Sequence, residues 1–243
     1  VSYVDDLVWA TRKREGRNPE ESHLADLETS FKRFADKDLQ LSAAKTSFFL
    51  KKVTFLSHVI SADGVRPCPK KISAITNFPA LTDKKAAMSY RGMCNFFRPH
   101  CRSLADKMAP ITNAICMEPY VRTRAVDKAQ EDINGMLTST ETMLAHPDES
   151  KLFIVHTDAS GIGAGAVLSQ YETLPDGSRG QLRPVEYYSR RFTRAERLYS
   201  AGEREVLAGL CAYENWRCYL AYAVSVWYTD SANIRFLMNS KNS

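Results

Sequence analysis

Acidic residues occur at two places where the surrounding sequence would hold them firmly. Asp5 and Asp6 stand between short apolar runs. Farther along, Asp158 and Asp230 each directly follow an apolar run typical of a strand, and Glu205 lies between them. Carboxylates held close together bind paired divalent cations that activate an attacking oxygen and stabilise a leaving one. The two sets therefore predict chemistry on phosphodiesters at two sites, each with two Mg²⁺ ions or, as a second candidate, Mn²⁺.

The first set is a weak indication when it is taken alone. Acidic residues are common in hairpin turns, and a bare Asp-Asp dipeptide occurs in many proteins. The apolar residues around Asp5 and Asp6 strengthen the case, because they predict two short strands joined by the acidic turn. We expect burial of these flanks to hold both carboxylates for metal binding.

The second set is more specific, because its acids fall at matching positions of a predicted sheet. We expect strands at 152–157, 164–168 and 185–189, then a helix at 203–219 and a fourth strand at 224–229. If the first and fourth strands are neighbours, their carboxyl ends and the start of the helix converge on one point. Like charges there require bound cations. The alternative is three unrelated surface acids.

Two glutamates compete for the position at the start of this helix. Ser200-Ala201-Gly202-Glu203 matches the S-x-x-E capping box, which gives Glu203 a structural role at the helix N-terminus. Glu205 has no such role. We therefore predict that Glu205 belongs to the acid site and that Glu203 belongs to the cap.

The rest of the chain predicts a short mixed segment followed by a helical one. A helix is expected at 19–39, with Leu24, Leu27, Phe31 and Phe34 on one buried face. Strands at 46–50 and 53–60 should follow, closed by a turn at Asp63-Gly64. Five prolines then mark the ends of successive helices, and the pattern returns to strands at His146-Pro147-Asp148, where we place a domain boundary. The prolines are Pro67, Pro69, Pro79, Pro99 and Pro110.

Composition and charge favour a globular protein with a polyanionic partner. The chain has 243 residues, 44% of them apolar, and a formal net charge of +5. The segment from Arg66 to Lys107 contains nine basic residues and two acidic ones. This excess fits contacts with phosphates, but it also fits a solvated helix face. The six cysteines lack metal-site spacing and predict reduced thiols. No membrane segment is expected, and a strand-like start at Val1 suggests a fragment of a longer protein.

Several motifs occur in the order found in one known family. Tyr3-Val4-Asp5-Asp6 resembles a polymerase catalytic hairpin, and the segment from Phe55 to Ser61 resembles a primer grip. The chain thus resembles, over nearly its whole length, the reverse transcriptase–ribonuclease H region of a Gypsy-type LTR retrotransposon Pol polyprotein. The further motifs that carry the resemblance are Asp63-Gly64-Val65-Arg66-Pro67, Phe96-Phe97-Arg98, His146-Pro147-Asp148, Thr157-Asp158-Ala159-Ser160, Gly165-Ala166-Val167-Leu168-Ser169-Gln170 and Tyr228-Thr229-Asp230-Ser231.

The resemblance implies a multidomain fold of the α/β and α+β classes. Residues 1–63 would be the C-terminal part of a reverse transcriptase palm, and residues 64–147 a helical thumb or connection-like region. Residues 148–243 would form a ribonuclease H-like mixed α/β sheet, truncated at its C-terminal end. The implied activities are RNA-directed DNA polymerisation and ribonuclease H cleavage of RNA–DNA hybrids, both by two-metal phosphoryl transfer.

The resemblance also implies roles for individual residues. Asp5 would bind metal in the polymerase site, with Asp6 supporting it, and Lys45 would lie near the incoming nucleotide as a general acid. Asp158, Glu205 and Asp230 would be the catalytic metal ligands of the ribonuclease H site. The residues expected to contact nucleic acid are Tyr3, Lys45, Phe55, Leu56, Ser57, His58, Arg66, Lys70, Lys71, Arg91 and Arg98.

The expected partners follow from the same resemblance. They are an RNA template, a DNA primer, RNA–DNA hybrids, deoxynucleoside triphosphates and the protease and integrase segments of the parent polyprotein, with no membrane partner. The expected location is a cytoplasmic virus-like particle, the nucleus, or both.

Some positions depart from the family pattern. Ser57 stands where the family usually has glycine, which adopts a positive φ at lower cost, and Ala43 and Thr46 replace a proline and a cysteine. The fingers, an upstream palm Asp and a fourth ribonuclease H acid are absent from the chain, so the fragment alone is expected to be inactive as a polymerase. One alternative is a decayed or truncated remnant that binds nucleic acid without catalysis. Another is a host protein with an unrelated ribonuclease H-like domain.

Overall fold

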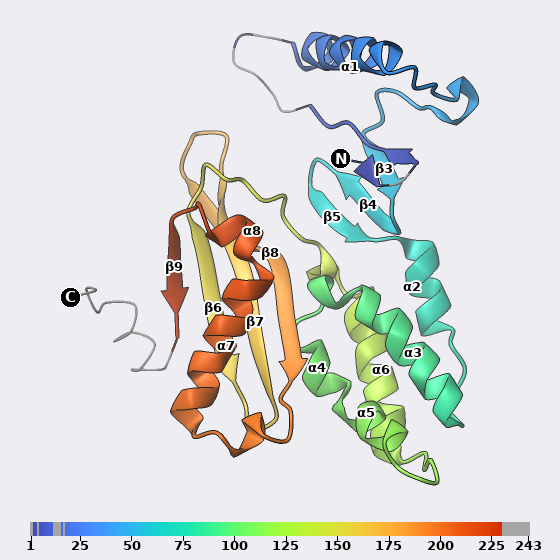
Figure 1. The fold of residues 1–243 in the computed structure, drawn as a ribbon, viewed down its shortest axis with the longest axis vertical. Helices are drawn as coiled ribbons and strands as arrows, with labels where there is room; N and C mark the ends of the chain where they lie inside the picture. The colour runs from blue at the N-terminus through green and yellow to red at the C-terminus, as the bar shows by residue number, and fades with distance from the viewer. Residues whose placement is uncertain (1, 4, 12–15, 17, 230–243) are drawn as a thin grey trace, which may run out of the picture. The chain divides into compact units, whose positions relative to one another are not determined.

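The chain folds into two compact units, Val1–Ala62 and Asp63–Ser243. The computed structural model describes residues 2–3, 5–11, 16 and 18–229 (Figure 1). No helix in these ranges is long and apolar enough to cross a membrane.

The first unit contains two hairpins and one long helix. Strands β1 (Ser2–Tyr3) and β2 (Asp6–Leu7) pair antiparallel, and helix α1 (Pro19–Asp36) follows. Helix α1 begins where the sequence favours it, with proline as its first residue and the Asn18 side chain accepting a hydrogen bond from the backbone N–H of Glu20 at 3.1 Å. After a 3₁₀ turn at Ala43–Lys45, strands β3 (Lys52–Phe55) and β4 (His58–Ser61) form the second hairpin.

The predicted buried face of α1 is largely wrong. Leu27 is buried, but Leu24 and Phe31 are 54% and 38% exposed. The helical period was correct, yet Leu27 is the one buried apolar side chain among the described residues of this unit, so there is little core for the stripe to face. The predicted strand at 46–50 is also wrong, since that segment is irregular.

The predicted strand at 53–60 is a hairpin instead. Leu56 and Ser57 form its two-residue turn with φ values of +46° and +65°, and Phe55 pairs with His58. Two successive positive φ values are the geometry of a type I′ turn, which normally carries Asn or Gly. The sequence lacked that signal, so the turn was missed.

The second unit begins with strand β5 (Gly64–Pro67) and a group of helices. The prolines were predicted to mark the ends of helices, and two of them lie at a helix start instead, Pro69 at the first position of α2 and Pro110 at the second of α5. The helices pack around Tyr90, Ile111 and Ile133, each with no exposed surface. Their bounds are α2 Pro69–Thr76, α3 Lys84–Phe96, α4 Leu104–Lys107, α5 Ala109–Ile115 and α6 Arg124–Thr138, with 3₁₀ turns at Arg98–His100 and Thr140–Thr142.

The unit also contains a four-stranded mixed sheet (Figure 1). Its strands are β6 (Phe153–Ala159), β7 (Gly163–Thr173), β8 (Arg179–Arg191) and β9 (Ser225–Tyr228). Their spatial order is β8-β7-β6-β9, and β9 pairs with β6 in parallel while the other pairs are antiparallel. This confirms that the first and fourth strands are neighbours.

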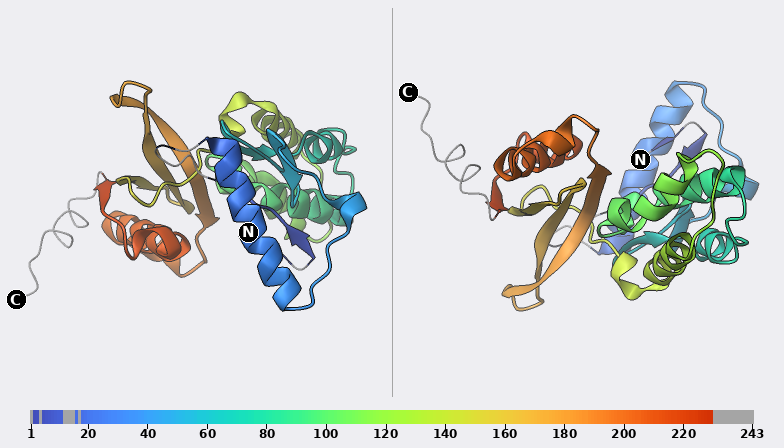
Figure 2. Two further views of the ribbon diagram at one scale, coloured as in Figure 1. Left: turned by 90° about the horizontal axis from the view of Figure 1, so that it is seen from above. Right: turned by 90° about the horizontal axis from the view of Figure 1, so that it is seen from below.

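Helix α7 (Ala201–Asn215) crosses one face of this sheet, preceded by a 3₁₀ turn at Glu196–Leu198 and followed by α8 (Arg217–Leu220). Its Ala212, with Trp216 just beyond its end, packs on Phe153 of β6 and Leu168 of β7. The predicted helix at 203–219 therefore ends earlier, at the fully buried Trp216. Figure 2 shows α7 on one side of the sheet and the helices of residues 69–138 on the other.

Hydrogen bonds link those helices to the sheet, one of them fully buried. Ser189 of β8 is 1% exposed, and its hydroxyl accepts a hydrogen bond from the backbone N–H of Ala105 at 3.1 Å. The guanidinium of Arg98 donates to the carbonyl of Ser189 at 3.0 Å, and that of Arg191 donates to the side chain of Asn113 at 2.9 Å. The described residues of this unit, 63–229, consequently form one packed body.

Candidate active site

Asp158 lies one residue before the carboxyl end of β6. Its neighbours in sequence alternate, since Val155 and Thr157 are buried while Asp158 is exposed. Across the sheet Asp158 is paired with Gly165 of β7, which presents no side chain beside it. The strand thus fixes the backbone of Asp158 and leaves its carboxylate accessible.

The start of α7 shows the predicted capping box. The Ser200 hydroxyl accepts a hydrogen bond from the backbone N–H of Glu203 at 3.3 Å, and the Glu203 carboxylate accepts one from the backbone N–H of Ser200 at 2.8 Å. These bonds lower the pKa of Glu203. The structural role predicted for Glu203 is confirmed.

Glu205 reaches the end of β6 from the first turns of α7. Its Oε1 atom accepts a hydrogen bond from the backbone N–H of Ala159 at 3.2 Å. Ala159 follows Asp158 directly, so the helix brings one predicted acid beside the strand end that carries another. Asp230, the third predicted acid, lies outside the described residues.

A further acid, Asp106 of α4, lies near Asp158 and was not predicted. Burial raises the pKa of Asp106, the negative charge of Asp158 raises it further, and the positive charge of Arg191 opposes both. A Cβ added at Gly163 would lie 3.4 Å from the Asp106 carboxylate and 2.7 Å from the Arg190 carbonyl, so glycine permits this close approach. Nothing in the local sequence of Asp106 indicates the contact, which arises from the packing of α4 on the sheet.

The chemical type of these groups fits a hard divalent cation. Asp158 and Glu205 offer carboxylate oxygens, the ligands that Mg²⁺ and Mn²⁺ prefer. Within the described residues there is no group of three or more His, Cys, Asp or Glu side chains placed to hold a metal ion. The described part of the site therefore supplies two carboxylates from two elements.

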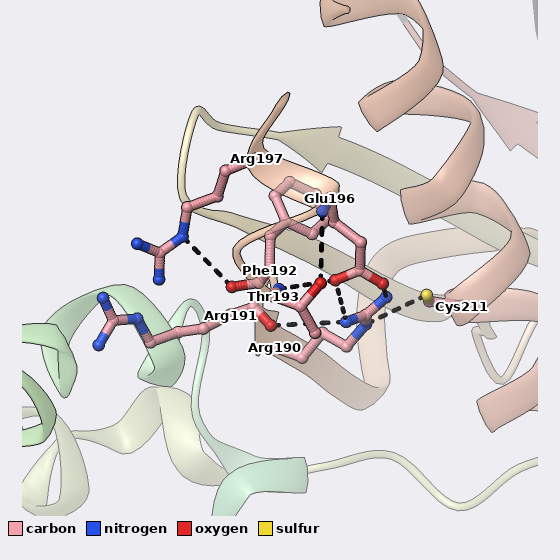
Figure 3. A network of polar contacts seen from close by, with 7 residues as sticks. All are labelled: Arg190, Arg191, Phe192, Thr193, Glu196, Arg197 and Cys211. Atoms are coloured by element: carbon pink, nitrogen blue, oxygen red, sulfur yellow. Dashed lines mark hydrogen bonds and ion pairs between the residues drawn. The ribbon is translucent and has the colours of Figure 1, made fainter. Parts of the chain in front are cut away.

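An ion-pair network lies between β8 and α7 (Figure 3). The guanidinium of Arg190 donates to both carboxylate oxygens of Glu196 at 2.9 and 2.8 Å and to the sulfur of Cys211 at 3.2 Å. Glu196 also accepts a hydrogen bond from the backbone N–H of Thr193 at 2.7 Å. These bonds lower the pKa of Glu196 to about 2. The network fixes the segment that leads into the helix of Glu205.

The N-terminal acids lie on the short β1–β2 hairpin. Asp5 is in the turn, Asp6 pairs with Tyr3, and both acids are exposed. The expected burial of their flanks is not observed: Tyr3 is 59% exposed, and Leu7 is half-buried. Each strand has only two paired residues, and the described residues of this unit bury little apolar surface, so the described flanks do not hold the carboxylates by burial.

The residues predicted to contact nucleic acid differ in their surroundings. Lys45, Lys70 and Lys71 are exposed, whereas Arg66 and Arg91 are half-buried.

Two others have partners within the protein. Arg98 donates to the Ser189 carbonyl at 3.0 Å and to the Asn95 side chain at 2.8 Å. The Nδ1 atom of His58 lies 2.8 Å from the Leu56 carbonyl, and burial lowers its pKa. Phe55 and Ser57 are half-buried beside it, and Leu56 is 37% exposed.

Comparison with known proteins identifies homologues of this chain. Residues 123–225 match the RNase H-like domain found in reverse transcriptase. Over 98% of its length the chain is 30% identical to the retrovirus-related Pol polyprotein from transposon 297 of Drosophila melanogaster, and over 99% it is 27% identical to that from transposon gypsy of the same species. The chain is homologous to transposon Pol polyproteins. This confirms the resemblance inferred from the motifs.

This Pol homologue also matches a transposon polyprotein from a second organism. Over 96% of its length it is 27% identical to the Tf2-3 polyprotein of Schizosaccharomyces pombe. It spans 21% of the transposon 297 protein and 17% of the Tf2-3 protein, so it corresponds to about a fifth of these relatives.

Solved structures share the fold of this Pol homologue. The foamy viral protease-reverse transcriptase dRH in complex with ds DNA aligns with a TM-score of 0.74 at 19% identity, covering 93% of this chain and 39% of that one. The foamy viral protease-reverse transcriptase in complex with RNA/DNA hybrid aligns with a TM-score of 0.70 at 21% identity, covering 90% and 29%. The mixed α/β architecture is thus that of a known class.

Proposed function

We propose that residues 148–243 are the ribonuclease H part of a retrotransposon Pol polyprotein and hydrolyse the RNA strand of RNA–DNA hybrids. Asp158, Glu205 and Asp230 are the proposed catalytic acids. The hydrogen bond from Ala159 to Glu205 carries the proposal, because it joins the helix of one acid to the strand end of another. The parallel pairing of β6 and β9 supports including Asp230, since both strands run toward the same edge of the sheet.

Each acid has a distinct task in this proposal. When bound, two Mg²⁺ or Mn²⁺ ions would supply the activation of water and the stabilisation of the leaving oxygen. Asp158 offers an accessible carboxylate from a rigid strand. The backbone N–H of Ala159 holds Glu205 at the end of β6, where its carboxylate would be a ligand. Asp106 adds negative charge beside Asp158, which favours cation binding there.

The N-terminal unit is proposed to belong to the polymerase of the same polyprotein. Asp5 would bind metal and Asp6 would support it, in a reaction that joins deoxynucleoside triphosphates to a DNA primer on an RNA template. Homology to Pol proteins over nearly the whole chain supports this assignment. The helices of residues 64–147 would contact phosphates as a thumb, with exposed Lys70 and Lys71 as contacts.

Hydrolysis of a labelled RNA–DNA hybrid in Mg²⁺ tests the first proposal. In the full Pol protein, Asp158→Asn and Glu205→Gln should each reduce cleavage roughly 100-fold or more, because each removes a charged metal ligand. Glu203→Gln is the matched control. It lies two residues from Glu205 and keeps a side chain that can cap the helix, so cleavage should change less than about threefold. Cleavage that persists in Asp158→Asn would contradict the assignment.

A remnant that binds nucleic acid without catalysis is the second candidate. The strained positive φ of Ser57, where the family usually has glycine, is the observation that favours it. If the wild-type Pol protein binds hybrid but leaves it uncut in both Mg²⁺ and Mn²⁺, the remnant replaces the active ribonuclease as the proposed function.

Association with protease and integrase segments, and location in a virus-like particle or the nucleus, are further proposals that depend on the intact polyprotein.

A further inference from the structure

The segment between β8 and α7 is strongly basic. We call residues 190–200 the arginine segment, because they contain four arginines and a single acid, Glu196. The segment includes the end of β8, the 3₁₀ turn at Glu196–Leu198 and the N-cap Ser200. It therefore leads directly from the sheet to the helix that carries Glu205.

The single acid is fully engaged inside the segment. Glu196 receives two hydrogen bonds from Arg190 and one from the backbone N–H of Thr193 (Figure 3). This pairing neutralises Arg190 and Glu196 against each other. The remaining positive charge of the segment belongs to Arg191, Arg194 and Arg197, and no acid within the segment is left to balance it.

The remaining arginines are placed at the surface of a rigid turn. Arg194 and Arg197 are exposed. The Nε–H group of Arg197 donates a hydrogen bond to the Phe192 carbonyl at 3.3 Å. In Figure 3 the side chains of Arg191 and Arg197 extend away from Cys211 and from the Arg190–Glu196 pair. Guanidinium groups on a fixed backbone lose little entropy when they bind phosphate.

Two large side chains at the end of the segment are exposed. Leu198 is 87% and Tyr199 is 44% exposed. An aromatic ring beside cationic groups is typical of surfaces that contact sugars and bases as well as phosphates. Tyr199 precedes the N-cap of α7, and Glu205 lies in the next turns of the same helix.

We propose that the arginine segment binds the sugar-phosphate backbone of an RNA–DNA hybrid beside the acid site. Arg194 and Arg197 contact phosphates, and Tyr199 and Leu198 contact the sugars or bases. The position of the bound strand relative to Glu205 rests on the proposed ribonuclease function, whereas the binding itself does not. Because phosphate contacts read no bases, the segment binds without sequence preference.

The test measures binding of the 243-residue chain to a fluorescent RNA–DNA hybrid by anisotropy, in EDTA so that no cleavage occurs. The double variant Arg194→Ala with Arg197→Ala should weaken binding about 10-fold near 0.2 M salt. The slope of log K against log salt should fall in magnitude by about 1.8, as expected for two lost phosphate contacts. An unchanged affinity and slope would overturn the proposal.

Two controls separate charge from structure. The variant Arg217→Ala with Arg179→Ala removes two exposed cations from other places in the same unit, outside both the arginine segment and the helices of residues 64–147, and should leave the affinity within about twofold. The variant Arg194→Lys with Arg197→Lys keeps both charges and should retain most of the binding. A lysine variant that binds as poorly as the alanine variant, or a control variant that weakens binding equally, would contradict phosphate contact by this segment. Thermal unfolding of each variant verifies that it is folded.

The two proposals can fail separately. Asp158→Asn should bind the hybrid as tightly as the wild type, because Asp158 lies outside the arginine segment. If the wild-type Pol protein cleaves hybrid while the alanine variant binds normally, the arginine segment proposal fails and the proposed function stands. If the alanine variant loses binding while the wild type does not cleave, the proposed function fails and the arginine segment proposal stands.

Discussion

At the scale of single residues, Glu203 and Glu205 show how position within one helix assigns different roles. Glu203 closes the capping box, and Glu205 accepts a hydrogen bond from the end of β6. The first role could be predicted because it depends on residues three apart. The position of Glu205 was predicted by elimination, and its hydrogen bond to the Ala159 backbone places it beside Asp158. Asp106 was missed, since no local pattern shows that a distant helix will bring a carboxylate to Asp158.

Ser57 provides a prediction at this scale. Its φ of +65° is costly for a residue with a Cβ, so Ser57→Gly should stabilise the β3–β4 hairpin by up to about 1 kcal/mol despite the greater freedom of glycine in the unfolded chain. Hydrogen exchange of residues 50–62 measures the effect as slower exchange. Ser61→Gly, in the extended strand β4, is the control and should be destabilising by about 0.5–1 kcal/mol. Equal destabilisation by Ser57→Gly and Ser61→Gly would contradict backbone strain at Ser57.

At the scale of secondary structure elements, the sheet was predicted better than the first hairpins. Continuous apolar runs predicted the positions of β6 and β9. Strands β7 and β8 are longer than predicted, because their ends, at 169–173 and 179–184, carry polar and charged residues that pair as a hairpin without an apolar signal. The network of Arg190 and Glu196 was also invisible to sequence patterns, although it ties three elements together.

The network predicts a pH-dependent stability. In the folded protein the pKa of Glu196 is about 2, below its ordinary 4.5. The ion pair therefore contributes fully to the free energy of unfolding above about pH 4.5, and this contribution is lost as the pH falls toward 2. Glu196→Gln should lower the free energy of unfolding by about 1–2 kcal/mol at pH 7, with the difference from wild type vanishing near pH 2. Urea unfolding at both pH values measures this.

A second carboxylate of the sheet provides the comparison. Glu172 of β7 accepts one hydrogen bond from Arg183 at 2.8 Å and is more exposed than Glu196. Glu172→Gln should therefore cost less than about 1 kcal/mol. A Glu196→Gln variant whose stability difference is constant between pH 2 and pH 7 would exclude the ion pair as the cause.

At the scale of the whole molecule, the helical segment and the mixed sheet on either side of the predicted boundary are in direct contact. The helices of residues 69–138 pack against β8, and the buried hydroxyl of Ser189 satisfies the backbone N–H of Ala105. The change of pattern at His146-Pro147-Asp148 was correctly located as a change from helices to strands. Whether two such parts pack as one body depends on side-chain contacts between distant segments, which sequence patterns do not report.

This packing predicts cooperative unfolding of residues 63–243. Ser189→Ala leaves the backbone N–H of Ala105 buried without its acceptor and should cost about 1–3 kcal/mol. Ser178→Ala, in the exposed β7–β8 turn, should change stability by less than about 0.5 kcal/mol. Calorimetry should show that Ser189→Ala shifts the helical and sheet parts together. Two separate transitions in the wild type would contradict the single body.

The parallel pairing of β6 with β9 has a consequence for synthesis. Strands β7 and β8, a 3₁₀ turn and helices α7 and α8 lie between them in the sequence, so the pair closes a long loop and is a late event in folding. On the ribosome, β6, β7 and β8 emerge and can pair while β9 is still being made. The edge of β6 that receives β9 stays uncovered during that interval, and the nascent chain passes through a stage in which this edge is open to association with other strands.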